Sequence, residues 1–366
     1  MGALRRRRVH VSPPAVAGID RHTAAMRIGV VGYGMGGRVF HAPFVQAAEG
    51  LELAGVVTRS PQRRAEVAAD LPGVPTFDSL ATLLDSGVDA VTITTPPETR
   101  RELVLEAAER GVAIVADKPF APSAQAAREL VSEVERLGAP LAIFHNRRWD
   151  TDVRTLKGLL DAGELGTPWR VESRFDLDEP STLDPGPTGG LLRDLGTHLA
   201  DQLIWLFGPV DQVYAKLDWI DLPEGRTDAG FSVVLRHTSG VSSTMRASKA
   251  NRLVARELRV YGSAGSYESQ MSDVQAQAVF AGRRPVDEGE AWGYEAEERW
   301  GVLRTAAGAR HVPSARGAYQ DFYTQFARAA RGDGPMPVTG ADAIRTLEVL
   351  DAARQSALEG RAVSVG

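Results

Sequence analysis

The sequence contains no cysteine among its 366 residues, so disulfide bonds, thiolate zinc sites and cysteine nucleophiles are excluded. No stretch approaches the ~20 consecutive apolar residues that a membrane-spanning helix needs. The 47 acidic residues outnumber the 42 Lys and Arg residues, which leaves a formal net charge of -5. A nucleic-acid-binding protein would have a basic excess. We therefore expect neither a membrane nor a nucleic acid as a partner.

The first 25 residues differ in composition from the rest of the chain. A block of four arginines at 5–8 is followed by two prolines and small residues, with no pattern that a helix or strand would bury. A twin-arginine export signal needs a continuous apolar segment, but a histidine, a serine and the prolines interrupt residues 9–17. We expect residues 1–25 to be a disordered extension of a cytoplasmic protein, unless translation begins at Met26.

From Met26 onward, short apolar runs alternate with helical patterns. Strands are expected at 27–31, 51–57, 90–94, 112–116 and 140–144, and the clearest helices at 98–110 and 124–137. Buried strands that alternate with helices are typical of a doubly wound parallel sheet. The fold class is therefore α/β, with an N-terminal Rossmann domain over residues 26–145.

After about residue 145 the pattern changes. A helix at 152–161, a strand at 169–177 and a helix ending at 207 precede four strands, at 213–220, 231–237, 241–248 and 255–261. Successive strands without intervening helices predict an open, mainly antiparallel sheet with helices on one face. A last helix begins near Thr339, which forms a capping-box pattern with Asp342. Residues 146–366 are thus predicted to form a C-terminal α+β domain.

A glycine-rich segment follows the first strand and matches G-x-G-x-x-G: Gly32, Tyr33, Gly34, Met35, Gly36 and Gly37. In a dinucleotide site the first glycine permits a tight turn and the second lets the backbone approach the pyrophosphate. The third lets the following helix pack closely, with its N-terminus toward the phosphates. The position between a strand and a helix favours this interpretation over a simple glycine-rich turn.

The end of the second strand indicates which dinucleotide is bound. An NAD site has Asp or Glu there to accept from the ribose 2′-hydroxyl, but this chain has Thr58, Arg59 and Ser60. Arg59 suits a 2′-phosphate, and the two hydroxyls can donate hydrogen bonds. The alternative is a solvated basic turn that opens the next helix. We predict NADP as the cofactor, with dual use of NAD left open.

Two separate segments supply candidate catalytic residues. Lys118 follows the strand expected at 112–116, at the edge of a parallel sheet where the reactive end of the cofactor lies; by itself it would more simply be a surface lysine. Asp194, His198 and Asp201 are spaced to share one helical face. That face also fits an ordinary polar surface, but a histidine beside a carboxylate after a flexible loop favours function. Without a further histidine cluster nearby, we expect no metal.

Several motifs together are specific for one family: 32–37 continuing into VFHAP at 39–43, TP at 95–96, DKP at 117–119, HNRRWD at 145–150, DLGTHLAD at 194–201 and AYQDFY at 318–323. From residue 26 nearly to its end, the chain resembles the glucose–fructose oxidoreductase/inositol dehydrogenase/rhizopine-catabolism (Gfo/Idh/MocA) family. It looks closest to the branch of NADP-dependent scyllo-inositol 2-dehydrogenases.

The resemblance implies an active site in the cleft between the two domains. It maps the family's catalytic lysine onto Lys118, its substrate-binding aspartate onto Asp194 and its catalytic histidine onto His198. Residues in the TP and DKP motifs, Thr95, Pro96, Asp117 and Lys118, join the expected cofactor contacts. The resemblance also implies a homodimer or homotetramer built through the open face of the second sheet.

Residues after the strand expected at 140–144 are further candidates. Asn146, Arg147 and Trp149 are expected to line the substrate site. For Arg147, or its neighbour Arg148, a structural ion pair is an equal alternative. Trp149 is more often a core residue than a platform for a sugar.

Together these residues could carry out the oxidation of a secondary ring hydroxyl. His198, with an ordinary pKa of ~6.5, would be the general base. Lys118 would donate to the developing alkoxide and lower the pKa of the histidine. Asp194 would fix the sugar or the imidazole. The predicted substrate is scyllo-inositol or its inosose; the alternatives are an aldose dehydrogenase, a keto-sugar reductase or a non-catalytic dinucleotide sensor.

The sequence departs from the family's pattern at three points. Asp117 stands where the family usually has glutamate, and Arg100 stands where a histidine is common. Residues 178–188 form a shorter segment than in the inositol branch and lack its tryptophan and basic residues. Because such loops bind the substrate, the third departure bears directly on which polyol is oxidised.

Overall fold

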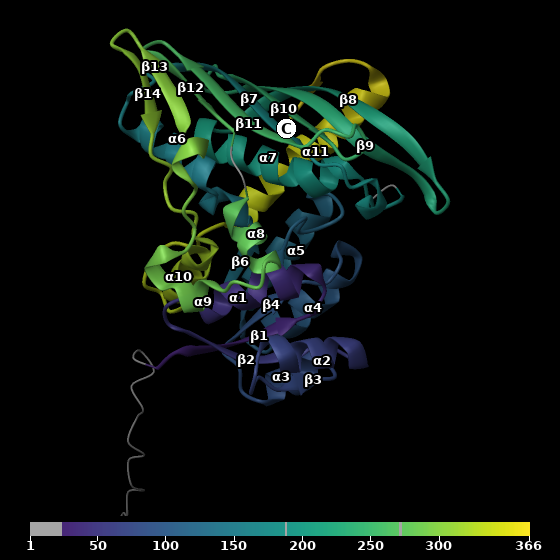
Figure 1. The fold of residues 1–366 in the computed structure, drawn as a ribbon. Coiled ribbons are helices and arrows are strands. Elements are labelled where there is room, and N and C mark those ends of the chain that lie inside the picture. The colour runs from purple at the N-terminus through teal and green to yellow at the C-terminus, as the bar shows by residue number, and fades with distance from the viewer. Residues whose placement is uncertain (1–23, 187–188, 271–272) are drawn as a thin grey trace, which may run out of the picture.

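The structure is a computed structural model that describes residues 24–186, 189–270 and 273–366. The extension expected over residues 1–25 therefore lies outside the described residues, apart from its last two. Figure 1 shows two sheets, one above the other, with helices between and around them. Strands between residues 26 and 144 form the lower sheet, and strands between residues 168 and 364 form the larger upper one.

The lower sheet confirms the expected doubly wound parallel fold. Its six strands follow the order β3-β2-β1-β4-β5-β6, and every neighbouring pair is parallel. The strands are β1 (Met26–Val31), β2 (Leu51–Val57), β3 (Thr76–Phe77), β4 (Ala90–Ile93), β5 (Ala113–Asp117) and β6 (Leu141–Phe144). Only β3 was not predicted, because a strand of two residues shows no periodicity.

Helices flank this sheet, and three of them begin at a serine cap. They are η1 (Gly36–His41), α1 (Ala42–Gln46), α2 (Pro61–Asp70), α3 (Leu80–Asp85), α4 (Pro97–Glu109) and α5 (Ala124–Leu137). The side chains of Ser60, Ser79 and Ser123 cap α2, α3 and α5 by accepting from backbone N–H groups. The α5 helix ends at Gly138, whose left-handed conformation (φ 72°) favours glycine.

The upper sheet confirms the expected open, mainly antiparallel arrangement. Its order is β14-β13-β12-β11-β7-β10-β9-β8-β15, and only β7 and β10 pair in parallel. The strands are β7 (Pro168–Asp176), β8 (Val210–Leu222), β9 (Gly225–His237), β10 (Ser242–Ser248), β11 (Ala255–Gly262), β12 (Gly265–Ser269), β13 (Gly301–Thr305), β14 (Gly308–Val312) and β15 (Val363–Ser364). The last four were not predicted, because they are short and β14 is exposed along most of its length.

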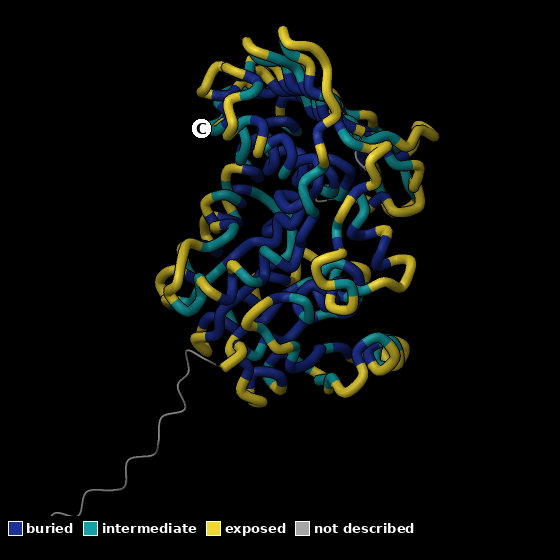
Figure 2. Tube along the Cα trace, turned by 60° about the vertical axis from the view of Figure 1, so that its left-hand side comes forward, coloured by how far each residue is buried: buried dark blue, intermediate teal, exposed yellow. Residues whose placement is uncertain are grey.

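Helices on one face of the upper sheet join it to the lower one. The α7 helix (Leu191–Phe207) packs on β9 and β10, and α11 (Gly340–Glu359) packs on β8, on α7 and on α5 of the lower part. Thr339 and Asp342 form the predicted capping box of α11. The tube of Figure 2 is buried where these helices lie between the sheets. The first turns of α7 are thereby held between the two sheets.

The remaining helices include α6 (Thr151–Asp161) and α10 (Tyr319–Ala330). A segment of the C-terminal half also returns to the glycine-rich loop, which the sequence did not predict. Its helix α8 (Val274–Phe280) contacts η1, and α9 (Pro285–Glu288) contacts α1. Within the described ranges, none of the helices combines the length and apolarity that crossing a bilayer requires.

Candidate active site

The glycine-rich loop has the conformation that a dinucleotide requires. Gly32 has a φ of +101°, which L side chains rarely adopt. A Cβ added at Gly37 would lie 2.1 Å from the carbonyl oxygen of Gly32, so the helix can approach the strand only through glycine. A Cβ at Gly34 would meet nothing within 4 Å, so open space lies beside its backbone. Tyr33 is buried and its hydroxyl donates to Asp70 Oδ2 (3.1 Å), whereas Met35 is 60% exposed.

Polar groups beside this loop are available to a ligand. Arg59 is exposed and forms no ion pair with any described residue, while Thr58 is buried. Ser60 accepts from the backbone N–H of Arg63 (3.3 Å), so it caps α2. The Thr95 hydroxyl is buried and has no hydrogen-bond partner in the described part of the chain. The open side of the loop and this unpartnered hydroxyl fit a bound dinucleotide.

Lys118 and Asp194 meet where the two sheets face each other. Lys118 Nζ donates to Asp194 Oδ1 (2.8 Å) and to the Asp194 carbonyl oxygen (3.2 Å). Lys118 directly follows β5, and Asp194 lies in the first turn of α7. That turn is fixed by Asp228, whose buried carboxylate accepts from the N–H of Leu192 (2.6 Å). The end of a parallel strand and the start of a helix therefore bring the two side chains together.

A second lysine contacts the same aspartate. Lys249, which follows β10, donates from Nζ to Asp194 Oδ2 at 2.8 Å. Burial alone would raise the pKa of Asp194, but Lys118 and Lys249 outweigh it and hold the pKa well below its usual value. Lys249 was not predicted, because no spacing in the sequence connects a residue after a strand of the second sheet with Asp194.

His198 lies one helical turn after Asp194. It is buried, and its Nδ1 has no hydrogen-bond partner among the described residues. Burial lowers the pKa of His198 well below its usual value, and the next largest cause is the positive charge of Lys118. The imidazole is therefore neutral near pH 7, which is the form that can accept a proton.

Asp201 completes the helical face that the sequence singled out. It is buried and accepts from Arg148 Nε (2.9 Å) and Nη2 (2.6 Å). His198 and Asp201 are thus directed into the protein, while the Asp194 side chain is 37% exposed, so the face is not the ordinary solvated surface that was the alternative. Of its three polar residues, Asp194 and His198 adjoin Lys118, and Asp201 forms a separate ion pair.

Comparison with known proteins identifies the family of the chain. The model described as oxidoreductase family, NAD-binding Rossmann fold matches residues 26–145, and the GFO/IDH/MocA C-terminal domain matches residues 153–268. The chain belongs to the Gfo/Idh/MocA family. It is therefore an oxidoreductase that uses a nicotinamide dinucleotide, as its Rossmann fold and lysine–histidine site led us to expect.

The chain is similar to several members over nearly its whole length. The uncharacterized oxidoreductase YdgJ of Escherichia coli is 36% identical, with 91% of this chain and 96% of YdgJ covered. The scyllo-inositol 2-dehydrogenase (NADP(+)) IolW of Bacillus subtilis is 27% identical, with 94% and 97% covered. A solved structure from Yersinia pestis is 31% identical and superposes with a TM-score of 0.84, with 95% and 99% covered.

Within this family fold, Arg100 holds the loop that carries Lys118. Arg100 is 2% exposed; its Nη1 donates to the carbonyl oxygens of Asp117 (2.6 Å) and Pro119, and its Nη2 donates to the carbonyl oxygen of Thr95. These carbonyls belong to the residues on either side of Lys118 and to the loop after β4. The arginine that departs from the family's pattern is therefore a structural clamp on both loops.

Asp117 is anchored on its other side by a buried histidine. His41 Nε2 lies 3.3 Å from Asp117 Oδ2, and His41 Nδ1 lies 2.5 Å from the hydroxyl oxygen of Tyr323. Burial would raise the pKa of Asp117, but His41, Arg100 and Lys118 together lower it. Asp117 Oδ1 accepts from the backbone N–H of Lys118 (2.7 Å). The shorter acid of the DKP motif is thus ionised and supports the lysine.

The residues after β6 are all buried. Asn146 is 4% exposed, and Trp149 packs edge-on against Phe322 in the core. Arg147 Nη1 donates to Asp273 Oδ2 (2.7 Å) and lies 3.4 Å from Asp150 Oδ2. In this structure the Arg147 guanidinium is therefore engaged in a buried ion-pair network, which was the alternative to substrate binding.

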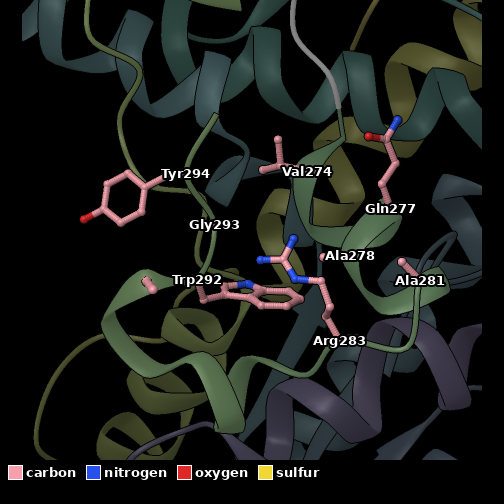
Figure 3. Close-up of a pocket in the computed structure, with 9 residues that line it drawn as sticks. Val274, Gln277, Ala278, Ala281, Arg283, Trp292, Gly293 and Tyr294 are labelled. Atoms are coloured by element: carbon pink, nitrogen blue, oxygen red, sulfur yellow. The ribbon is translucent and has the colours of Figure 1, made fainter. Parts of the chain in front are cut away.

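A separate cavity of about 240 Å³ lies in the segment that returns to the glycine-rich loop. Figure 3 shows its lining, with Arg283 above the indole of Trp292. Arg283 is held by Glu288, and Trp292 is fully buried. Its lining includes none of the site residues expected from the sequence, so the reacting groups lie elsewhere.

Proposed function

We propose that the protein is an NADP-dependent dehydrogenase that oxidises a secondary ring hydroxyl of a polyol or sugar, with scyllo-inositol as the first candidate. Residues 26–145 hold the dinucleotide, and residues 146–366 bind the substrate. The observation that carries the proposal is the contact between the Lys118 ammonium and Asp194, one helical turn before the neutral His198. A proton donor, an anionic acceptor and a base are thus available to one hydroxyl group.

The reaction follows from these three side chains. His198 takes the hydroxyl proton while the C–H bond of the same carbon breaks and the C=O bond forms. Lys118 donates to the oxygen as negative charge develops on it, and Asp194 accepts from a substrate hydroxyl. When bound, NADP supplies the nicotinamide ring that accepts the hydride. The products are a ketone, reduced cofactor and one proton; the reverse reaction returns the proton from His198.

The cofactor assignment extends to three groups of residues. The loop from Gly32 to Gly37 would hold the pyrophosphate, and Thr95, Pro96, Asp117 and Lys118 would contact the nicotinamide end. Arg59 would pair with the 2′-phosphate, assisted by the hydroxyls of Thr58 and Ser60, since the Ser60 hydroxyl only accepts where it caps α2. Support for NADP comes from the unpaired Arg59 and the absence of a carboxylate at the end of β2.

The substrate assignment rests on fewer residues. IolW, whose name specifies scyllo-inositol and NADP, is similar over 94% of this chain. Asn146 stays a proposed substrate contact, while Trp149 and Arg147 support its segment through core packing and buried ion pairs. The short segment 178–188 favours a second candidate, an aldose such as glucose or xylose, because it lacks the tryptophan and basic residues of the inositol branch.

A substrate panel tests both candidates. We expect purified protein to form NADPH with scyllo-inositol faster than with myo-inositol, glucose or xylose, and NADP to be preferred over NAD. Faster turnover of glucose or xylose would transfer the assignment to the aldose candidate. No turnover of any of the four compounds with either dinucleotide would contradict the proposed function.

The open face of the upper sheet is proposed to form a homodimer or homotetramer. Tyr214 and Val234, a cross-strand pair on β8 and β9, are 40% and 42% exposed, and Trp169 on β7 is 59% exposed. Large apolar side chains on a sheet face are typical of an interface. Light scattering coupled to gel filtration should give two or four times 39.3 kDa, and a monomer would exclude this assembly.

A further inference from the structure

Asp194 is shared by two lysines that come from different sheets. Lys118, after β5 of the lower sheet, donates to Oδ1, and Lys249, after β10 of the upper sheet, donates to Oδ2, each at 2.8 Å. The proposed reaction uses the first lysine only. The second is a buried charged group for which hydride transfer gives no role.

The position of Lys249 is fixed by its own backbone. Its N–H donates to the carbonyl oxygen of Ala229 (3.0 Å), and its carbonyl oxygen accepts from the N–H of Glu179 (3.1 Å). The residue is 5% exposed. Burying an ammonium group is costly unless a partner compensates it, and here a single carboxylate is shared with Lys118, so two positive charges meet one negative charge. Stability therefore does not account for a second lysine at this point.

The other charges near His198 are paired within their own clusters. Arg147 pairs with Asp273, Arg256 with Asp150, and Arg148 with Asp201. Tyr319 donates to Asp150, and buried His145 has a lowered pKa because of burial, so neither adds a positive charge at pH 7. The net charge near His198 then depends on how many lysines pair with Asp194. With both lysines it is net positive, and with Lys118 alone it is neutral.

We propose that Lys249 is a positioning residue for hydride transfer, a role that rests on the proposed function of the site. It holds the Asp194 carboxylate and neutralises its charge. The ammonium charge of Lys118 then remains available to the substrate oxygen and keeps His198 in its neutral form. Lys249 acts through Asp194 and needs no contact with the substrate.

Replacing Lys249 by methionine should change the field at His198 with a definite sign. One positive charge is lost, so Asp194 is compensated by Lys118 alone, and protonation of His198 becomes easier. The pKa of His198 should rise by about half a pH unit or more. Lys249→Arg keeps the charge and should leave that pKa near the wild-type value. The kcat/KM for the best polyol should fall about tenfold or more in Lys249→Met and less in Lys249→Arg.

The test is an NMR titration of 13C-labelled histidine in the full-length protein, with the His198 signal assigned by its loss in His198→Asn. Lys157→Met serves as the matched control, because Lys157 also pairs with an aspartate but on the surface. Thermal unfolding checks that each variant is folded. A His198 titration at higher pH in Lys249→Met only supports the proposal. The same titration in wild type and Lys249→Met, or equal shifts in Lys249→Met and Lys249→Arg, overturns it.

This titration needs no substrate, so its result is independent of the polyol panel. A protein that oxidises no polyol but shows the shift would retain the electrostatic role of Lys249 and lose the proposed reaction. A protein that oxidises a polyol and shows no shift would retain the reaction and lose the role of Lys249. The two failures are therefore distinguishable.

Discussion

Lys118 Nζ lies 2.8 Å from Asp194 Oδ1, although 76 residues separate the two in the sequence. Lys118 directly follows a strand of the lower sheet, and Asp194 lies in the first turn of a helix that covers the upper sheet. Their contact therefore exists only when the two halves of the chain pack together. The α11 helix, which contacts both α5 and α7, provides much of that packing.

The buried His198 should make stability depend on pH. Its pKa is lowered in the folded protein, so below pH ~6.5 the unfolded chain binds a proton that the folded protein excludes. The free energy of unfolding should therefore fall as the pH drops below ~6.5, by up to about 1.4 kcal/mol per pH unit from this group. Urea unfolding of wild type and His198→Asn between pH 5 and 8 measures the difference.

That difference isolates His198 because all other titrating groups are common to both proteins. The wild type should lose more stability than His198→Asn between pH 6.5 and 5. Parallel curves for the two proteins would mean that the histidine titrates normally in the fold. The electrostatic account of the site would then be wrong.

Cofactor selection should depend on Arg59. Because it is exposed and unpaired among the described residues, Arg59→Ala should leave the fold intact. It should lower kcat/KM for NADP by about tenfold or more and change that for NAD less than threefold, since only NADP carries the 2′-phosphate. Arg64→Ala is the control, because Arg64 already pairs with Asp78. Equal losses with both dinucleotides would remove the basis for choosing NADP.

Two glycines of the same loop should respond differently to alanine. A Cβ at Gly34 meets nothing within 4 Å, so Gly34→Ala should unfold like the wild type and yet bind the dinucleotide at least about tenfold more weakly. A Cβ at Gly37 lies 2.1 Å from a backbone oxygen, so Gly37→Ala should lower the free energy of unfolding by about 1–3 kcal/mol. Chemical unfolding and cofactor titration separate the effects. Unchanged cofactor affinity in Gly34→Ala would contradict the proposed site of the pyrophosphate.

Arg100 should matter for both stability and activity. Its guanidinium donates to three backbone carbonyls, so Arg100→Met leaves buried acceptors without a partner. We expect a loss of about 3 kcal/mol or more in the free energy of unfolding, and a lower kcat because the loop of Lys118 loosens. Arg101→Met, which removes a surface ion pair with Glu133, should cost under about 1 kcal/mol. Similar losses in the free energy of unfolding for the two variants would contradict the structural role of Arg100.

Much of the fold was predictable because its signals are local. The strand β2 and the helix α5 coincide with the predicted ranges, since the first is a mostly apolar run and the second has strongly periodic apolar residues. The capping box at Thr339 was predicted from two residues. Strands β12 to β15 were missed because each has five residues or fewer, too few for a clear pattern.

The site was predictable only in part. The roles suggested for Lys118, Asp194 and His198 came from strand ends, helical spacing and family motifs. The contacts of Lys249, His41 and Arg100 depend on tertiary packing between distant segments, and no local pattern records such pairing. The ion pair between Arg147 and Asp273, which are 126 residues apart, likewise could not be predicted from sequence spacing.

The central claim is that Lys118 and His198 act on one substrate hydroxyl as a unit. A double-mutant cycle on kcat/KM with NADP and the best polyol tests it most directly, using Lys118→Ala, His198→Asn and the double variant. We predict losses of about 10²–10⁴-fold for each single variant and a similar loss for the double variant, because either change disables the same step. Losses that multiply in the double variant, or a Lys118→Ala enzyme within about threefold of wild type, would contradict the account.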